Sequence, residues 1–237
     1  MEKSYAKVST LIKEKILAGE LVPGDHLPPE REMAELLDTS RNSVREGLRV
    51  LENVGVIESR QGSGNYISGR FEETLTEVMS FMYVMKGMKD SEITEFRCAL
   101  EWQAMNLAAE RITEGQKKRL MRHLEALEAA ETEADRSAQD KAIHYVLMEA
   151  SGNNYMIASY NAIVRIMDIY IPKMRGKIIM GMQDDTELSK AHRMIAEGAA
   201  EGDLDKGLGG LELHFKYIKE YQDSWNRSRS DSGCCFI

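Results

Sequence analysis

Four ionisable residues in the second half of the chain have the types and spacing of a metal site. Asp140 and His144 are four positions apart, so on a helix they lie one above the other on the same face. His192 and His214 each fall within an apolar stripe of helical period, on two further predicted helices. Imidazole and carboxylate groups bind Zn, Ni, Fe and Mn. These four residues are therefore predicted to hold a divalent metal ion, with positions left open if the ion is six-coordinate.

Taken singly, each of these histidines has a simpler interpretation. A lone histidine on an inward helix face is more often a hydrogen-bonded core residue than a ligand. The metal hypothesis depends on three histidines and a carboxylate occurring together, and it leaves open whether the ion binds a small ligand or is purely structural. His123 lies at the edge of its helical stripe and His26 lies in a loop. Neither is included in the predicted site.

A second set of residues has the chemistry to contact nucleic acid. Arg41, Arg45 and Arg49 recur every fourth residue, so on a helix they form a row displaced from the apolar face of the same segment. Guanidinium groups suit both phosphate oxygens and the N7/O6 edge of guanine. Asn42 and Ser43 are short polar residues near the start of this segment, the end of a recognition helix that usually meets base edges.

A helix-turn-helix would position these side chains. Residues 28–37 predict a short helix, 38–40 a turn and 41–51 a second helix. Two helices joined by so short a turn are typical of DNA-binding domains whose second helix lies in the major groove. Residues 56–67 then predict a hairpin with a Gly-rich turn at 61–64. Glycines there would let backbone N–H groups approach a phosphate closely.

The order of these segments resembles the GntR family of bacterial transcription regulators. The resemblance is carried by Leu27–Ala34, Ser40–Leu48, Gly55–Ile57 and the wing tip at Gln61 and Gly62. It implies a winged helix-turn-helix domain. The DNA contacts that the resemblance implies fall on Arg31, Ser40, Arg41, Asn42, Ser43, Arg45, Gln61 and Gly62. Gly47 stands where the family often has Ala, which should loosen the recognition helix slightly.

Beyond residue 70 strand signals end and helical periods continue to about residue 225. The candidate helices cover 72–87, 91–111, 114–133, 136–150, 154–175, 186–200 and 203–223. The predicted fold class is therefore mainly α. It combines a winged helix-turn-helix domain at 1–70 with an all-α bundle of six or seven helices at 71–225, long enough to enclose a cavity. Residues 226–237 are predicted to form a disordered tail.

The predicted bundle is similar to the effector-binding FCD domain of the FadR branch of the GntR family. Asp140 and His144 match its Asp-x-x-x-His motif, and His192 and His214 match its two later histidines. Arg97 opens a matching Arg-x-x-x-Glu motif, and the resemblance implies that it meets the carboxylate of a small organic acid. The Gly-rich run 207–210 departs from the Ala-rich helix of the family and should weaken the last helix just before the second of these later histidines.

Charge limits how the chain would bind DNA. The formal net charge is −8, and residues 1–68 carry −2 of it. The affinity for DNA would therefore depend on where the arginines sit, and dimerisation would double their contacts. No stretch approaches the ~20 apolar residues that cross a bilayer, and the N-terminus has no signal-peptide pattern. We therefore expect a cytoplasmic protein without membrane contact.

Two functions fit these features. The first is a ligand-responsive transcription regulator that binds a palindromic double-stranded operator as a homodimer and senses a small carboxylate at a metal-containing cavity. The second is a metal-dependent hydrolase or oxygenase with a DNA-binding tether. The second lacks a candidate general acid or base beside the metal, and it leaves the helix-turn-helix without a purpose. The sequence therefore favours a regulator that is not an enzyme.

Overall fold

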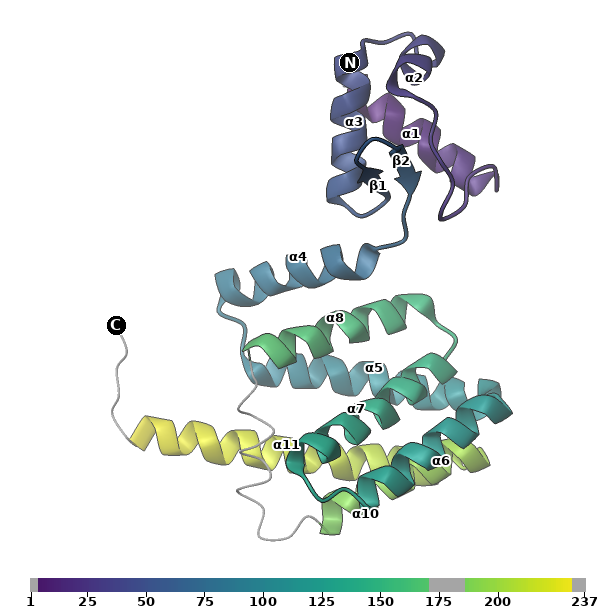
Figure 1. Ribbon diagram of the computed structural model, residues 1–237. Helices are drawn as coiled ribbons and strands as arrows, with labels where there is room; N and C mark the ends of the chain where they lie inside the picture. Colours follow the sequence, from purple (N-terminus) through teal and green to yellow (C-terminus); the bar gives the residue numbers. More distant parts are fainter. Residues whose placement is uncertain (1–3, 171–185, 232–237) are drawn as a thin grey trace. The chain divides into compact units, whose positions relative to one another are not determined.

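The computed structural model describes residues 4–170 and 186–231 of the 237 (Figure 1). It confirms the mainly α fold class, with one small two-stranded sheet after a helix-turn-helix. The chain divides into two compact units, the first ending at Val78 and the second beginning at Met79. Each unit has its own hydrophobic core. The predicted boundary at residue 70 falls just before helix α4 (Phe71–Lys86), within which the two units divide.

The first unit contains three helices and a hairpin in the part of the chain described. The helices are α1 (Ser4–Leu17), α2 (Glu30–Leu36) and α3 (Arg41–Asn53). Strands β1 (Ile57–Arg60) and β2 (Gly64–Ile67) pair antiparallel and form the predicted wing. Helix α1, which was not predicted from the sequence, buries apolar side chains in the same core as α3. It therefore packs against the apolar face of α3.

The turn between α2 and α3 is set by local chemistry. Ser40 caps α3, because its hydroxyl accepts a hydrogen bond from the backbone N–H of Ser43 at 3.1 Å. Asp38 has a φ of +44°, a conformation that short polar residues tolerate better than most. These two residues end one helix and start the next within a few positions, as the helix-turn-helix requires.

The second unit is helical throughout the residues described. After α4, its helices are α5 (Asp90–Arg111), α6 (Glu114–Glu128), α7 (Glu133–Ala150), α8 (Asn154–Tyr170), α10 (Thr186–Glu201) and α11 (Leu204–Asp231). Helix α7 begins three residues earlier than predicted because the Thr132 side chain caps it, accepting from the N–H of Asp135.

Some sequence predictions fall on residues that the structure does not describe. The end of the helix predicted at 154–175 lies outside the described residues, and so does the part of the predicted tail at 232–237. Helix α11 itself is described as far as Asp231, into the segment predicted as tail. The disordered tail therefore stays a prediction.

Glycines bring α10 and α11 unusually close together. A Cβ atom added at Gly198 of α10 would lie 2.4 Å from the backbone nitrogen of Gly207 on α11. One added at Gly210 would lie 2.7 Å from the backbone nitrogen of Ile195. The Gly-rich run 207–210 therefore lies within a continuous α11 and serves close backbone packing, which offsets the low helix propensity of its residues.

Candidate metal centre and nucleic-acid interface

Three helices of the second unit bring His144, His192 and His214 together. One potential ligand atom of each lies within 4.8 Å of those of the other two. The ring centroids are 4.6 to 5.5 Å apart, and all three side chains are buried. The histidines come from α7, α10 and α11, as the sequence predicted. The close α10–α11 contact explains why His192 and His214 meet.

Asp140, the fourth predicted ligand, borders two of these histidines. Its Oδ1 atom lies 3.2 Å from Nε2 of His144 and 3.3 Å from Nε2 of His192. The group whose potential ligand atoms all lie within 4.8 Å of one another consists of the three histidines and does not include Asp140. A single carboxylate placed between two imidazoles supplies the negative charge that a buried cation would need.

The buried ring nitrogens of the cluster fit a metal ion. Nε2 of His144, Nε2 of His192 and both ring nitrogens of His214 have no hydrogen-bond partner among the described residues. Leaving a buried polar atom unsatisfied costs about 1–3 kcal/mol, so several in one place call for an explanation. A divalent ion bound by one nitrogen of each histidine would satisfy three of the four.

Glu101 is part of this site, although the sequence analysis assigned it no role. It is fully buried on α5, and its Oε2 atom lies 2.6 Å from Nδ1 of His144. Its other oxygen, Oε1, accepts a hydrogen bond from Nε of Arg97 at 2.5 Å. The spacing of four residues predicts the contact between Arg97 and Glu101. No local pattern predicts the contact to His144, which is 43 positions away.

The pKa values of the cluster reflect this network. Burial alone would raise the pKa of Glu101, but Arg97 and His144 outweigh it and hold that pKa below its usual value. Burial would lower the pKa of His144, yet the charge of Glu101 raises it. Burial, together with the other two histidines, holds the pKa of His214 well below its usual value. His214 is thus neutral at pH 7, the form that binds metals.

Two further side chains surround Arg97, the predicted effector residue. Its guanidinium carbon lies 5.4 Å from the ring centroid of Phe215 on α11. Tyr160 of α8 interacts with Arg97, and burial raises the pKa of its hydroxyl. Arg97 itself is only 9% exposed. Sequence analysis missed Tyr160, because nothing in its own helix distinguishes it from the apolar core residues beside it.

The recognition helix α3 divides its surface as predicted. Val44, Leu48 and Leu51 are buried, whereas Arg41 and Arg49 are exposed. Asn42 and Arg45, two further predicted DNA contacts on this helix, are also exposed. The predicted contacts Ser40 and Ser43 lie at the start of the helix, where their hydroxyl oxygens are 3.0 Å apart. The two serines therefore have a structural role whether or not they contact DNA.

Arg45 is held by a carboxylate from the preceding helix. Its Nε and one terminal nitrogen donate to the two carboxylate oxygens of Glu30 at 3.2 and 2.9 Å. Arg31, the predicted contact on α2, lies 3.9 Å from Glu35, one turn away. The paired guanidinium of Arg45 is thus oriented before any DNA is bound.

The wing tip is exposed, and His26 contacts the hairpin beside it. Gln61 and Gly62 lie at its turn, where Gly62 has a φ of +74°. Nε2 of His26 lies 3.0 Å from the carbonyl oxygen of Ser63, and its ring packs edge-on against Tyr66 at 4.9 Å. His26, omitted from the predicted sites, therefore holds the hairpin against the loop before α2.

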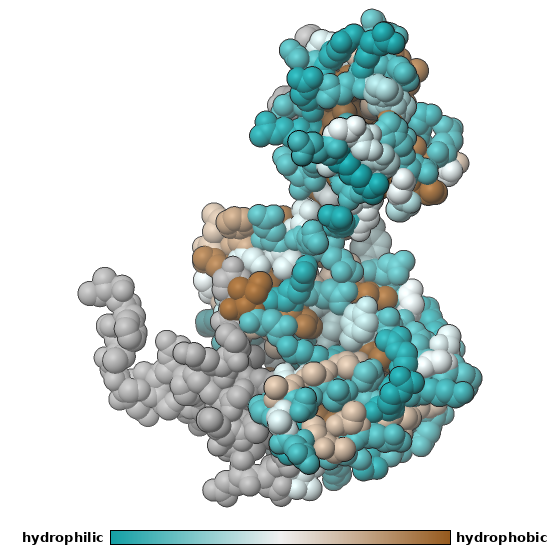
Figure 2. Space-filling view, viewed as in Figure 1, coloured by the Kyte–Doolittle hydropathy of each residue, from teal (hydrophilic) through white to brown (hydrophobic). Residues whose placement is uncertain are grey.

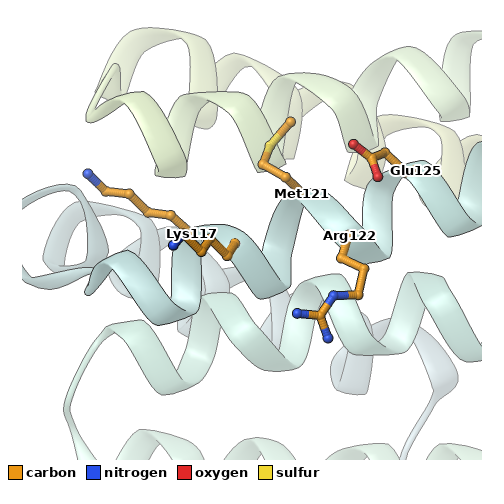
Figure 3. Close-up of a pocket in the computed structure, with 5 residues that line it drawn as sticks. Lys117, Met121, Arg122 and Glu125 are labelled. Carbon is orange, nitrogen blue, oxygen red and sulfur yellow. The ribbon is translucent and has the colours of Figure 1, made fainter.

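A surface pocket on α6 lies apart from these groups. Figure 3 shows Met121 and Glu125 extending from one side of the helix and Arg122 from another, and Lys117 also lines the pocket. All of its lining residues come from this single helix, and none belongs to the histidine cluster. It therefore has no connection to the predicted metal centre.

Comparisons with known proteins agree with both halves of this description. The family described as bacterial regulatory proteins, gntR family, matches residues 4–67. The FCD domain matches residues 92–216. Among the described residues, the helices fall short of the length and apolar character needed to cross a membrane.

Similar proteins extend over nearly the whole chain. An uncharacterised HTH-type transcriptional regulator of Mycobacterium tuberculosis is 37% identical over 228 residues, covering 92% of this chain and 90% of the relative. The HTH-type transcriptional regulator LutR of Bacillus subtilis is 32% identical over 204 residues, covering 85% and 93%. The solved structure of Streptococcus agalactiae GntR is 27% identical with a TM-score of 0.68, covering 92% of this chain and 99% of that one.

Proposed function

Because the chain belongs to the GntR family of bacterial regulatory proteins and carries an FCD domain, we propose that its DNA affinity responds to a small organic acid at a metal centre. It is a transcription regulator and not an enzyme, as its families and relatives are.

The first unit is proposed to bind operator DNA through α3 and the wing. The exposed row of arginines on α3 supports this, since guanidinium groups read guanine and grip phosphate. Arg41 and Arg45 lie at the start and middle of the helix and are proposed to read bases. The predicted contacts at Arg31, Asn42, Arg49, Gln61 and Gly62 are exposed and available to position the helix on the duplex.

The second unit is proposed to hold a divalent ion with His144, His192, His214 and Asp140. The buried ring nitrogens that have no hydrogen-bond partner among the described residues are the observation that carries this proposal. When bound, the ion would supply open coordination positions for a carboxylate oxygen. Zn, Ni, Fe and Mn all accept such a ligand set.

Arg97 is proposed to pair with the carboxylate of the effector. It is linked to His144 through Glu101, which places its positive charge next to the cluster. A guanidinium and a metal ion together would bind a small carboxylate from two sides. The hydrogen bonds from the guanidinium to the carboxylate would be strong because both groups are charged. Hydroxy and keto acids of a few carbons are therefore the proposed class of effector.

A homodimer is proposed to form through the predicted all-α domain, residues 71–225, which begins with α4. Helix α4 exposes four apolar side chains at helical spacing: Val78, Phe81, Met82 and Met85, which are 52%, 59%, 41% and 80% exposed. Figure 2 shows hydrophobic residues at the surface in the region where α4 lies in Figure 1. A two-fold dimer would suit a palindromic operator, with half-sites about one helical turn apart. A DNA partner would also suit the cytoplasmic location that we expect from the sequence.

The experiment that tests this function compares operator binding with and without metal and acid. Purified protein is freed of metal and reloaded with Zn²⁺, and its affinity for operator fragments is measured against a panel of hydroxy and keto acids. We expect one acid to change the affinity about 10–100-fold, an ordinary size for coupling between two sites.

The His192→Ala, His214→Ala double variant provides the control. It should lose the metal by elemental analysis, keep its helical content and still bind operator, but no longer respond to the acid. Full metal occupancy in this variant would refute the ligand assignment. A wild-type protein that binds Zn²⁺ but responds to no acid would instead support a purely structural ion, a role that the complete burial of the cluster also suits.

A further inference from the structure

Glu101 occupies a position between the predicted effector residue and the metal cluster. Its side chain is fully buried, and each of its oxygens is committed to a different partner. Oε1 accepts from Nε of Arg97, and Oε2 lies 2.6 Å from Nδ1 of His144.

The contact with Glu101 decides which nitrogen of His144 can bind a metal. A neutral imidazole carries one proton, and the nitrogen opposite to it has the lone pair. The short contact to a carboxylate places the proton on Nδ1, so the lone pair is on Nε2. Nε2 is the atom that faces the cluster, 3.2 Å from the carboxylate of Asp140.

Asp140 makes this choice consequential. In the other tautomer His144 would donate from Nε2 to Asp140, which would remove both a nitrogen and a carboxylate oxygen from the set of ligands. The contact of Nε2 with Asp140 is the longer of the two, at 3.2 Å, against 2.6 Å for the contact of Nδ1 with Glu101. The buried carboxylate of Glu101 therefore favours the tautomer that can bind a metal.

We propose that Glu101 is a positioning residue that fixes His144 for metal binding and connects it to Arg97. The inference rests on the metal site of the proposed function. Arg97 holds the second oxygen of the same carboxylate, so an anion that draws the guanidinium away changes how Glu101 meets His144. Arg97 thus acts on the metal indirectly, through Glu101 and His144.

Zn²⁺ binding to the full-length Glu101→Gln variant tests the first part. The change keeps the size of the side chain and removes its charge. The matched control is Glu95→Gln, an exposed position on the same helix. Zn²⁺ affinity, measured by competition with a chromophoric chelator, should fall about 10–100-fold in Glu101→Gln and stay unchanged in the control.

A spectroscopic readout separates positioning from a general loss of structure. In the Zn²⁺-loaded wild type, the Nδ1 proton of His144 should give a downfield, slowly exchanging resonance, because it donates to a buried carboxylate. This resonance should move upfield in Glu101→Gln while the helical content, measured by circular dichroism, stays the same. An unchanged resonance and unchanged Zn²⁺ affinity would overturn the proposal.

Glu101→Gln leaves the buried Arg97 without its carboxylate and could prevent folding. The Arg97→Gln, Glu101→Gln double variant removes both charges and supplies the same measurement. Where Glu101→Gln folds, Arg97→Gln should weaken Zn²⁺ binding several-fold in the wild-type background and have no further effect in the Glu101→Gln background. Equal effects in both backgrounds would show that Arg97 acts independently and would refute the connection.

The outcome for the wild type keeps the two proposals apart. If the wild-type protein binds no Zn²⁺, the metal centre of the proposed function fails, and this inference fails with it. If the wild type binds Zn²⁺ through its histidines and Glu101→Gln binds it equally well, only the role of Glu101 is refuted.

Discussion

At the scale of single residues, the pairing of Arg45 with Glu30 would affect how the proposed recognition helix meets DNA. The two groups form a two-point ion pair on the surface of the first unit. Glu30 is about half as exposed as its partner, so it is held in place while the guanidinium faces outward. Such a pair fixes one rotamer of a long, flexible side chain before binding, which lowers the entropy lost on contact with a base.

Replacing Arg41 or Arg45 with Ala should weaken operator binding. Each replacement should cost about 1–3 kcal/mol if the side chain makes a two-point contact with guanine. Fluorescence anisotropy with operator DNA at physiological salt measures the loss. Arg122→Ala on α6 is the control for charge and should leave the affinity unchanged. Unchanged affinity in both α3 variants would sink the assignment of α3 as the recognition helix.

Glu30→Gln should release Arg45 and relax its selectivity. Removing a carboxylate beside the interface should strengthen binding to non-specific DNA, because the local potential becomes more positive. The ratio of operator to non-specific affinity should fall. Glu35→Gln removes the same charge from α2 beside Arg31 and should raise both affinities equally. Identical behaviour of the two variants would mean that the pairing with Arg45 has no role in selectivity.

At the scale of elements, the contact between α10 and α11 sets the geometry of the histidine cluster. His192 lies on one helix and His214 on the other, and at Gly198 and Gly210 the contact leaves no room for a methyl group. A small change in the separation of these helices would therefore move two of the proposed ligands at once. Interiors packed this closely transmit such a displacement instead of absorbing it.

Gly198→Ala should separate the two helices and weaken metal binding. Its Cβ would meet backbone, so either α10 or α11 must shift, at a cost of about 1–3 kcal/mol in the free energy of unfolding. Zn²⁺ affinity should fall at least tenfold. The control is Gly209→Ala, whose Cβ would meet only the flexible end of Met194 at 3.3 Å. That variant should keep its Zn²⁺ affinity and gain up to about 1 kcal/mol from higher helix propensity. Equal losses in both variants would contradict the role of Gly198.

The sequence predicts elements best where a local period or cap decides them. The arginine row on α3 and the spacing of Asp140 and His144 need only the geometry of one helix. The contact of Glu101 with His144 joins two helices, so it depends on how α5 packs against α7. The glycines of α11 are a similar case. Their low helix propensity can be read from the sequence, but the residues of α10 that pack against them cannot. Helix α1 was not predicted, because the DNA-binding motifs of the sequence begin only at Leu27, after this helix has ended.

At the scale of the whole molecule, assembly would couple the two units. Residues 1–68, with a net charge of −2, have little general attraction for DNA, so two copies on one operator would supply the affinity that a single copy lacks. The exposed apolar stripe on α4 is the proposed contact between copies. Its helix follows the wing directly along the chain, so a change at the dimer contact would bear on the spacing of the two recognition helices.

Charges placed on α4 should therefore break the dimer. We expect Phe81→Glu with Met85→Glu to sediment as a monomer at micromolar concentration and to bind operator at least tenfold more weakly, with the histidine cluster still able to bind Zn²⁺. Val22→Glu places a charge at a similarly exposed apolar position of the first unit and should remain a dimer. A wild type that is monomeric and still binds operator tightly would contradict the proposed assembly.

The three histidines of the cluster come from segments far apart in the chain. Their attachment to a single ion would close two long loops of polypeptide, which restricts the unfolded chain much as a cross-link does. Local opening of α7, α10 or α11 would then require release of the ion. Amide hydrogens in these three helices should exchange more slowly as the free metal concentration rises, while those of the first unit should not change. The supply of metal would thus set how long the sensing half of the molecule stays folded, independently of any effector.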